Sequence, residues 1–200
     1  MSLFDVPERE LLPYDGSAMY FDWVLGDMDA ENLFTALLRD VPWESRTVKM
    51  FGKEYPQPRL VAWFGDPGRG YTYSGISMNI NPWTPQLESL KAICEQKAGK
   101  SFNSLLLNLY RNGDDKVSWH SDNESELGYE PCIASLSLGA VRRFKFRHLE
   151  SREVVECSLP PGSLVVMSGL SQIKWEHEVP KESRVKEPRI NLTFRFVDAA

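Results

Sequence analysis

Several features that define other classes of protein are absent from this sequence. No apolar run approaches the roughly 20 residues that a membrane-spanning helix needs, and there is no internal repeat or low-complexity tract. The opening residues, MSLFDVPERE, carry acidic side chains and no apolar core, which predicts that no secretory signal peptide is present. We therefore expect no membrane partner and a cytoplasmic protein, or a nuclear one in a eukaryotic cell.

Cysteine is scarce as well. The three cysteines, Cys94, Cys132 and Cys157, are far apart and form no CxxC motif. A disulfide-stabilised scaffold or a zinc knuckle would need paired or closely spaced cysteines. The pattern therefore predicts free thiols in a reducing compartment.

Basic residues are outnumbered, but their distribution limits what this excludes. The net charge is −5, yet residues 1–31 hold eight acidic residues and one basic residue, which leaves a balance of +2 over residues 32–200. A phosphate backbone needs only a local basic surface. The candidate groups for such a surface are Arg46, Lys49 and Lys53; Arg142, Arg143, Lys145 and Arg147; and Lys181, Arg184 and Lys186. A nucleic-acid partner is therefore permitted.

Length and patterning predict one domain of the α+β class, because 42% of the 200 residues are hydrophobic and no linker divides them. Two helices are predicted: residues 30–40, with a buried stripe that includes Leu38, and residues 85–98, between Thr84 as N-cap and Gly99. Short strands are predicted at residues 104–110, 133–138, 143–148, 154–159, 163–167 and 190–197. We expect a jelly-roll-like β core with the N-terminal helices packed outside.

Two of the chain's three histidines stand in a pattern typical of a metal site. His120 and Asp122 are two residues apart, which in an extended backbone puts both side chains on one face, and His177 follows far downstream. Two imidazoles and one carboxylate leave three positions of an octahedral ion open, as in non-heme Fe(II) oxygenases. An isolated HxD also occurs by chance, and zinc accepts the same ligands. The third histidine, His148, lies among basic residues, and we predict a surface or phosphate-facing position for it.

The last predicted strand distinguishes between these possibilities. Its alternate residues form an apolar face and a polar face. The polar face consists of Arg189, Asn191, Thr193 and Arg195. A solvent-exposed edge strand would show the same alternation, but arginine suits bidentate recognition of a carboxylate, and 2-oxoglutarate has two. Asn108 and Tyr110 stand on a similar face of the strand at 104–110 and can donate to the same anion.

Four motifs of the chain together resemble the AlkB family of nucleic-acid demethylases. They are Asn108-Leu109-Tyr110, His120-Ser121-Asp122, Trp175-Glu176-His177 and the strand PRINLTFR at 188–195. The resemblance extends from about Arg46 to Val197, and the RxNxTFR strand after an HxD and a distal histidine is its most specific part. It implies a double-stranded β-helix and a dioxygenase that depends on Fe(II), 2-oxoglutarate and O2.

The resemblance also implies roles for individual residues. His120, Asp122 and His177 would be the catalytic iron ligands. The residues that would bind 2-oxoglutarate are Asn108, Tyr110, Arg189, Asn191 and Arg195. Over a single domain of residues 1–200, about 1–45 would be an N-terminal segment, about 46–80 a nucleotide-recognition region and about 100–197 the catalytic core, in a monomeric enzyme.

The activity implied is oxidative demethylation of N-alkylated nucleobases of the 1-methyladenine and 3-methylcytosine type. The substrate would be single- or double-stranded DNA, with RNA as a second candidate, and the reaction would release formaldehyde, succinate and CO2 in alkylation repair. The damaged base must leave its stack. We expect Tyr73 to stack on it, with Tyr71 and Trp63 in the same aromatic stretch, and Glu124 to contact its edge; for Glu124 an exposed loop carboxylate is the alternative.

Strand preference stays open. Met50 and Phe51 match a short apolar finger that fills the gap left by a flipped base in duplex-preferring members. Residues 103–111 and 179–196, however, look closer to members that favour single strands.

Two other functions share the same core. One is a 2-oxoglutarate-dependent hydroxylase of a protein or small molecule, with different entrance loops. The other is a non-catalytic nucleic-acid-binding module with a vestigial site, which the complete His/Asp/His set and the two arginines argue against. The aromatic stretch and the local basic residues favour nucleobase demethylation over the first.

Overall fold

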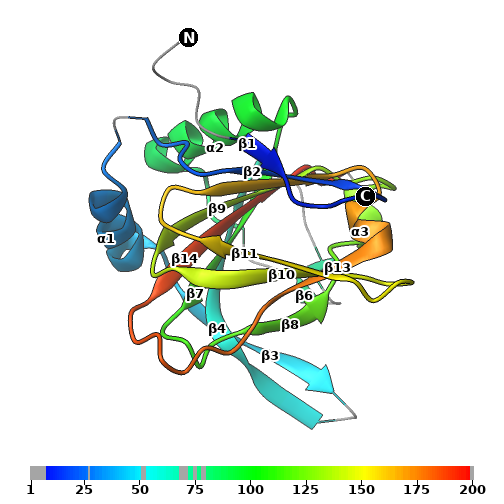
Figure 1. Ribbon diagram of the computed structural model, residues 1–200. Helices are drawn as coiled ribbons and strands as arrows, with labels where there is room; N and C mark the ends of the chain where they lie inside the picture. The colour runs from blue at the N-terminus through cyan, green and yellow to red at the C-terminus, as the bar shows by residue number, and fades with distance from the viewer. Residues whose placement is uncertain are drawn as a thin grey trace.

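The computed structural model describes residues 8–26, 28–50, 53–67, 72–73, 76–77 and 80–198. Most strands belong to two sheets that pack against each other (Figure 1). The strands of the larger sheet are β1 (Glu8–Glu10), β2 (Ser17–Phe21), β3 (Glu44–Met50), β4 (Lys53–Gly65), β7 (Ser104–Tyr110), β9 (Ile133–Gly139), β12 (Leu164–Ser168) and β14 (Arg189–Arg195). The strands of the smaller sheet are β8 (Val117–His120), β10 (Arg142–His148), β11 (Val154–Leu159) and β13 (Trp175–Val179). A separate ribbon pairs β5 (Thr72–Tyr73) with β6 (Ile76–Ser77).

The strands β7 to β14 form the predicted double-stranded β-helix. The larger sheet has the order β1-β2-β12-β9-β14-β7-β4-β3, and the smaller has the order β11-β10-β13-β8. Following the chain, β7, β9, β12 and β14 lie in the larger sheet, while β8, β10, β11 and β13 lie in the smaller one. The chain therefore crosses repeatedly between two antiparallel sheets, which is the jelly-roll arrangement.

The two long helices cover the outer face of the larger sheet (Figure 1), as predicted. They are α1 (Ala30–Asp40), capped by Asp29, and α2 (Pro85–Ala98), capped by Thr84 and ended by Gly99. Leu33, Leu87 and Leu90 are buried against the outward apolar residues of β7, β9 and β14. Leu38 was predicted to be buried and is 36% exposed, because it lies about 100° round the helix from Leu37. Among the described helices, none is long and apolar enough to cross a membrane.

The strands that the sequence did not predict include β8 and β13. Each is only four or five residues long and carries polar side chains, as VSWH and WEHEV, so no apolar run marks it. They lie beside each other in the smaller sheet, with His120 directly opposite His177. Two of the three expected metal ligands are therefore brought together by a pairing that the sequence pattern did not reveal.

A hairpin of β3 and β4 extends beyond the sandwich (Figure 1). The second half of β4, from Leu60 to Gly65, pairs with β7. The first half pairs only with β3, as far as Met50 opposite Lys53. The predicted nucleotide-recognition region thus begins on a projecting hairpin that joins the rest of the sheet through the second half of β4.

Replacing Gly139 should test the packing of α1 on the sheet. Gly139 has φ +81°, and a Cβ there would lie 2.5 Å from the Pro188 carbonyl oxygen and 2.6 Å from the Phe34 ring. We expect Gly139→Ala to lower the free energy of unfolding by more than about 2 kcal/mol, as measured in urea. The control is Gly99→Ala, at φ +62° with no atom within 4 Å of the added Cβ, where about 1 kcal/mol is expected. Equal losses would show that backbone conformation alone is responsible.

Candidate active site

A polar cavity lies between the two sheets. Its walls come from the inner faces of β4, β7 and β14 on one side and of β8, β10 and β13 on the other. The polar residues that line it include Arg59, Asn108, Tyr110, His120, Asp122, His177, Arg189, Asn191, Thr193 and Arg195. The polar face of β14 is therefore turned inward, and the alternative of a solvent-exposed edge strand is wrong: β14 is a central strand between β9 and β7.

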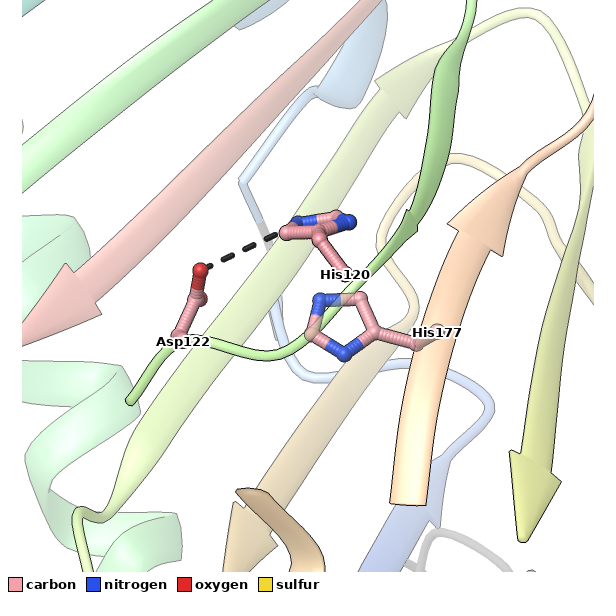
Figure 2. A group of neighbouring side chains, drawn as sticks. All are labelled: His120, Asp122 and His177. Atoms are coloured by element: carbon pink, nitrogen blue, oxygen red, sulfur yellow. Dashed lines mark ion pairs between the residues drawn. The ribbon is translucent and has the colours of Figure 1, made fainter. Parts of the chain in front are cut away.

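His120, Asp122 and His177 form a compact group at this cavity. Each offers a ligand atom, and these atoms all lie within 4.8 Å of one another. The two imidazole rings have centroids 4.2 Å apart. Figure 2 shows the three side chains converging from β8, the loop after it and β13. This geometry suits a single metal ion with positions left open for other ligands.

Asp122 does not lie on the same strand as His120. The strand β8 ends at His120, so Asp122 reaches the group from the following loop and not through the two-residue period that the sequence suggested. Its carboxylate Oδ2 accepts a hydrogen bond of 2.6 Å from Nη2 of Arg195. Burial, the largest single effect, opposes ionisation, but the charge and hydrogen bond of Arg195 together with the attraction of His177 and His120 outweigh it and hold the pKa of Asp122 at about 2. Oδ1 has no hydrogen-bond partner among the described residues, as expected of an oxygen available to a cation.

The surroundings of the two imidazoles also suit metal ligands. Nδ1 of His120 lies 2.8 Å from the Ser118 carbonyl oxygen. Donation from Nδ1 to that carbonyl leaves Nε2 unprotonated on the side of Asp122. Burial, and then the neighbouring His120, lower the pKa of His177 to about 3. At neutral pH its ring is therefore uncharged and can offer a lone pair.

Arg189 has the environment of a carboxylate receptor. It is 1% exposed, and its Nη2 donates to Ser137 Oγ at 2.9 Å. Its Nε and Nη1 find no hydrogen-bond partner in the described part of the chain. Its guanidinium carbon lies 5.3 Å from the centre of the Tyr110 ring. Burial lowers the pKa of Arg189 to about 10, so it stays charged at neutral pH. Buried, charged donors without partners fit an anionic ligand such as 2-oxoglutarate.

The other expected cosubstrate residues face the same cavity with partly used hydrogen-bonding groups. Asn108 Oδ1 accepts from Arg59 Nε at 2.8 Å, and Asn191 Nδ2 donates to Ser135 Oγ at 2.8 Å. Arg195, which was expected beside 2-oxoglutarate, contacts Asp122.

Arg59 also lines the cavity and was not predicted from the sequence. It shares the inner face of β4 with Val61 and Trp63, and the even spacing of the three would have marked it had β4 been recognised.

The expected substrate contacts are described only in part. Phe51 and Tyr71 lie outside the described residues, and only the backbone of Met50 and Tyr73 is described. Trp63 is 2% exposed and packs in an apolar cluster with Val61, Leu106, Leu127 and Val197. The indole is therefore part of an apolar cluster in this structure, and its expected contact with the damaged base stays a prediction.

Glu124 lies near Asp122 and Arg195, and it is half-buried instead of an exposed loop carboxylate. It immediately precedes the short 3-10 helix η1 (Ser125–Leu127). Burial and then the neighbouring Asp122 raise its pKa, while Arg195 partly opposes the change. Its buried Oε2 has no hydrogen-bond partner within the described ranges. The side chain therefore has an unused acceptor near the expected metal ligands.

The prediction for His148 is wrong. The ring is 3% exposed and packs edge-on against Tyr14 and Trp175. Its Nδ1 accepts from the Ser151 backbone, and its Nε2 lies 3.2 Å from Asp15 Oδ2. The acidic partner comes from 133 residues earlier in the chain, which is why inspection of the neighbouring sequence did not reveal it.

Several of the basic residues that were candidates for a phosphate-binding surface have acidic neighbours. Arg142 is 1% exposed and cannot present its charge to a ligand outside. Five further candidates form ion pairs: Arg46–Glu44, Arg143–Glu182, Lys145–Glu156, Arg147–Glu176 and Lys181–Asp114. The run at 142–147 therefore does not form an unopposed positive stripe.

Comparison with known sequences agrees with this geometry. Residues 17–195 match the sequence model of the 2OG-Fe(II) oxygenase superfamily. The chain is 49% identical to the alpha-ketoglutarate-dependent dioxygenase alkB homolog 3 of Bos taurus over 84% of this chain and 62% of that protein. It is 37% identical to the DNA oxidative demethylase ALKBH2 of Mus musculus over 96% of this chain and 84% of that protein. The chain thus spans about three fifths of the length of the homolog 3 proteins.

Solved structures show the same fold. OsALKBH1 superposes with a TM-score of 0.66 at 15% identity, over 95% of this chain and all of that one. A 2OG-Fe(II) oxygenase family oxidoreductase from Burkholderia pseudomallei gives a TM-score of 0.59 at 19% identity, over 89% of this chain and 84% of that one. The family's cofactors are Fe(II) and 2-oxoglutarate, with O2, and the His/Asp/His group and Arg189 fit them. The chain therefore belongs to the AlkB family within the 2OG-Fe(II) oxygenase superfamily.

Proposed function

We propose that this protein is a dioxygenase that oxidatively demethylates N-alkylated nucleobases in DNA, with RNA as a second substrate. The observation that carries the proposal is a three-ligand metal group in the same cavity as a buried, charged Arg189, whose Nε and Nη1 find no hydrogen-bond partner among the described residues. This combination suits a metal and a dicarboxylate together. Relatives named DNA oxidative demethylase, and the proposed base-binding region at about 46–80, support a nucleobase over a protein or metabolite substrate.

The metal-binding and cosubstrate-binding residues of the cavity have proposed roles. His120, His177 and Oδ1 of Asp122 hold Fe(II), and Arg195 keeps Asp122 ionised beside them. Arg189, next to Tyr110, pairs with one carboxylate of 2-oxoglutarate, and Asn108 and Asn191 complete its site. When bound, Fe(II), 2-oxoglutarate and O2 would supply the oxidising power. One oxygen atom of O2 would enter succinate as 2-oxoglutarate loses CO2, and the other would convert the N-methyl group to an N-hydroxymethyl group, which would break down to formaldehyde and the repaired base.

Glu124 is proposed to contact the edge of the damaged base. Its Oε2 has no hydrogen-bond partner among the described residues, and its raised pKa reflects a poorly solvated carboxyl group. A cationic base such as 1-methyladenine or 3-methylcytosine would supply the missing partner, as a charge-assisted hydrogen bond. Tyr73 is proposed to stack on the base, with Tyr71 beside it.

The place of action and the assembly are also proposals. A DNA substrate requires the cytoplasm of a bacterial cell or the nucleus of a eukaryotic one. We also propose that the enzyme is a monomer.

Removing the cation of Arg189 should weaken 2-oxoglutarate binding. We expect Arg189→Met to raise the apparent KM for 2-oxoglutarate by about 100-fold, since charge-assisted hydrogen bonds are lost. Decarboxylation of labelled 2-oxoglutarate measures this. The control is Arg184→Met, which removes an exposed arginine and should change nothing. His120→Ala should abolish the decarboxylation altogether; unchanged kinetics in that variant or in Arg189→Met would refute the assignment.

Formaldehyde release tests the substrate class. Purified protein with Fe(II), 2-oxoglutarate and ascorbate should release formaldehyde from oligonucleotides that contain 1-methyladenine or 3-methylcytosine. Single-stranded DNA, duplex DNA and RNA are assayed side by side, with unmethylated oligonucleotides as controls. Decarboxylation without formaldehyde from any of the three would reject a nucleobase substrate and leave the hydroxylase alternative.

Phe51→Ala tests the proposed finger. Met50 and Lys53 are paired at the end of the projecting hairpin, and Phe51 and Gly52 connect them in the sequence. If Phe51 fills the gap in a duplex, the variant should lose about tenfold in kcat/KM on duplex DNA and little on single strands. An equal loss on both substrates would eliminate the finger.

A further inference from the structure

The short helix α3 (Ser171–Lys174) has no part in the proposed chemistry, yet one of its side chains contacts a metal ligand. Gln172 is 1% exposed, and its Oε1 accepts a hydrogen bond of 2.9 Å from the backbone N–H of Asp122. The two residues are 50 apart in the chain. This hydrogen bond of a buried amide side chain therefore fixes the relative position of two segments that are far apart in the sequence.

Gln172 is itself fixed from several directions. Its Nε2 donates to Met167 Sδ at 3.4 Å and to Ser171 Oγ at 3.3 Å. Gly16 lies against the backbone of Ser171 so closely that a Cβ on Gly16 would be 2.4 Å from the Ser171 nitrogen. The helix is therefore held between β12 and the segment that leads into β2.

A second contact ties the same loop to β13. Ser121 Oγ donates to the Trp175 carbonyl oxygen at 2.8 Å. Trp175 is fully buried, and its indole N–H donates to the Tyr14 carbonyl oxygen at 3.1 Å. Two consecutive residues of the loop, Ser121 and Asp122, are thus attached to the continuous segment from α3 into β13. That segment carries His177 two residues after Trp175.

This attachment fixes the position of Asp122, which strand pairing does not. The strand stops at His120, so the pairing with β13 that sets the distance between the two histidines does not extend to Asp122. Arg195 holds the carboxylate, but it extends from β14 in the other sheet. A neutral amide on the backbone N–H fixes the main chain without adding charge beside the ligands.

We propose that Gln172 is a positioning residue that holds Asp122 at the correct distance from His177 and thereby sets the affinity of the site for a divalent cation. The proposal depends on the metal-binding role of the His/Asp/His group. Hydrogen bonds that orient metal ligands typically change metal affinity by about 10- to 100-fold when they are removed.

The test is the dissociation constant for Mn(II), measured by calorimetric titration of the metal-free protein. Gln172→Met keeps the length of the side chain but ends it in a methyl group, so the amide oxygen that accepts from Asp122 is lost. We expect the dissociation constant to rise by about 10- to 100-fold. The visible absorption of bound Co(II), which depends on ligand geometry, should change as well. Lys174→Ala, on the same helix but in an exposed pair with Glu150, should bind Mn(II) like the wild type.

Thermal unfolding of the metal-free variants separates positioning from stability. A lower Tm with an unchanged Mn(II) dissociation constant would show that Gln172 only supports the fold, and would overturn the proposal. If Gln172→Met does not fold, Gln172→Asn decides the question, because it keeps the amide and withdraws it by one methylene. An unchanged affinity in Gln172→Asn would equally reject the positioning role. Failure of the wild-type protein and Lys174→Ala to bind Mn(II) would instead refute the metal site itself.

Discussion

The ion pair between Arg195 and Asp122 connects the two halves of the active site. Their side chains are 4% and 3% exposed, and the two atoms are 2.6 Å apart. Arg195 belongs to the centre of the larger sheet, and Asp122 to the loop that follows an edge strand of the smaller one. Removing Arg195 would leave the buried carboxylate of Asp122 without its ion-pair partner, at a cost of about 3–5 kcal/mol. The pair helps to keep the carboxylate ionised and holds it near the histidines, as the proposed metal binding requires.

The two faces of the larger sheet differ: the outer face is packed with apolar residues, and the inner face is polar around the cavity. On the outer face of the larger sheet, Leu107, Leu136 and Leu192 are fully buried beneath the helices. On the inner face of the same strands, asparagines, serines and arginines surround the cavity. Buried donors without partners, as on Arg189, are destabilising until an acceptor arrives. The apolar layer under the helices supplies the stability that lets the inner face remain polar.

Much of this organisation was readable in the sequence, and the errors have physical causes. The two long helices and the strands β7, β9, β10, β11, β12 and β14 were predicted to within two residues at each end, because apolar residues recur regularly in them. The strands β8 and β13 were missed because they are short and polar, although they carry His120 and His177. The partners of buried polar residues were missed too: Asp15 for His148 and Gln172 for Asp122 lie at distances in sequence that no local pattern reports.

The sequence by itself determined which residue types could form the site. They are two histidines and an aspartate for a metal, and two arginines on the polar face of one strand for a dicarboxylate. It also determined the faces of β7 and β14, since side-chain alternation is a local property of a strand. Only the tertiary structure decided that His120 lies opposite His177, that Arg195 pairs with Asp122 and that Arg142 is buried. Those outcomes depend on which strands become neighbours, and strand order is fixed by the packing of the whole chain, not by any one segment of it.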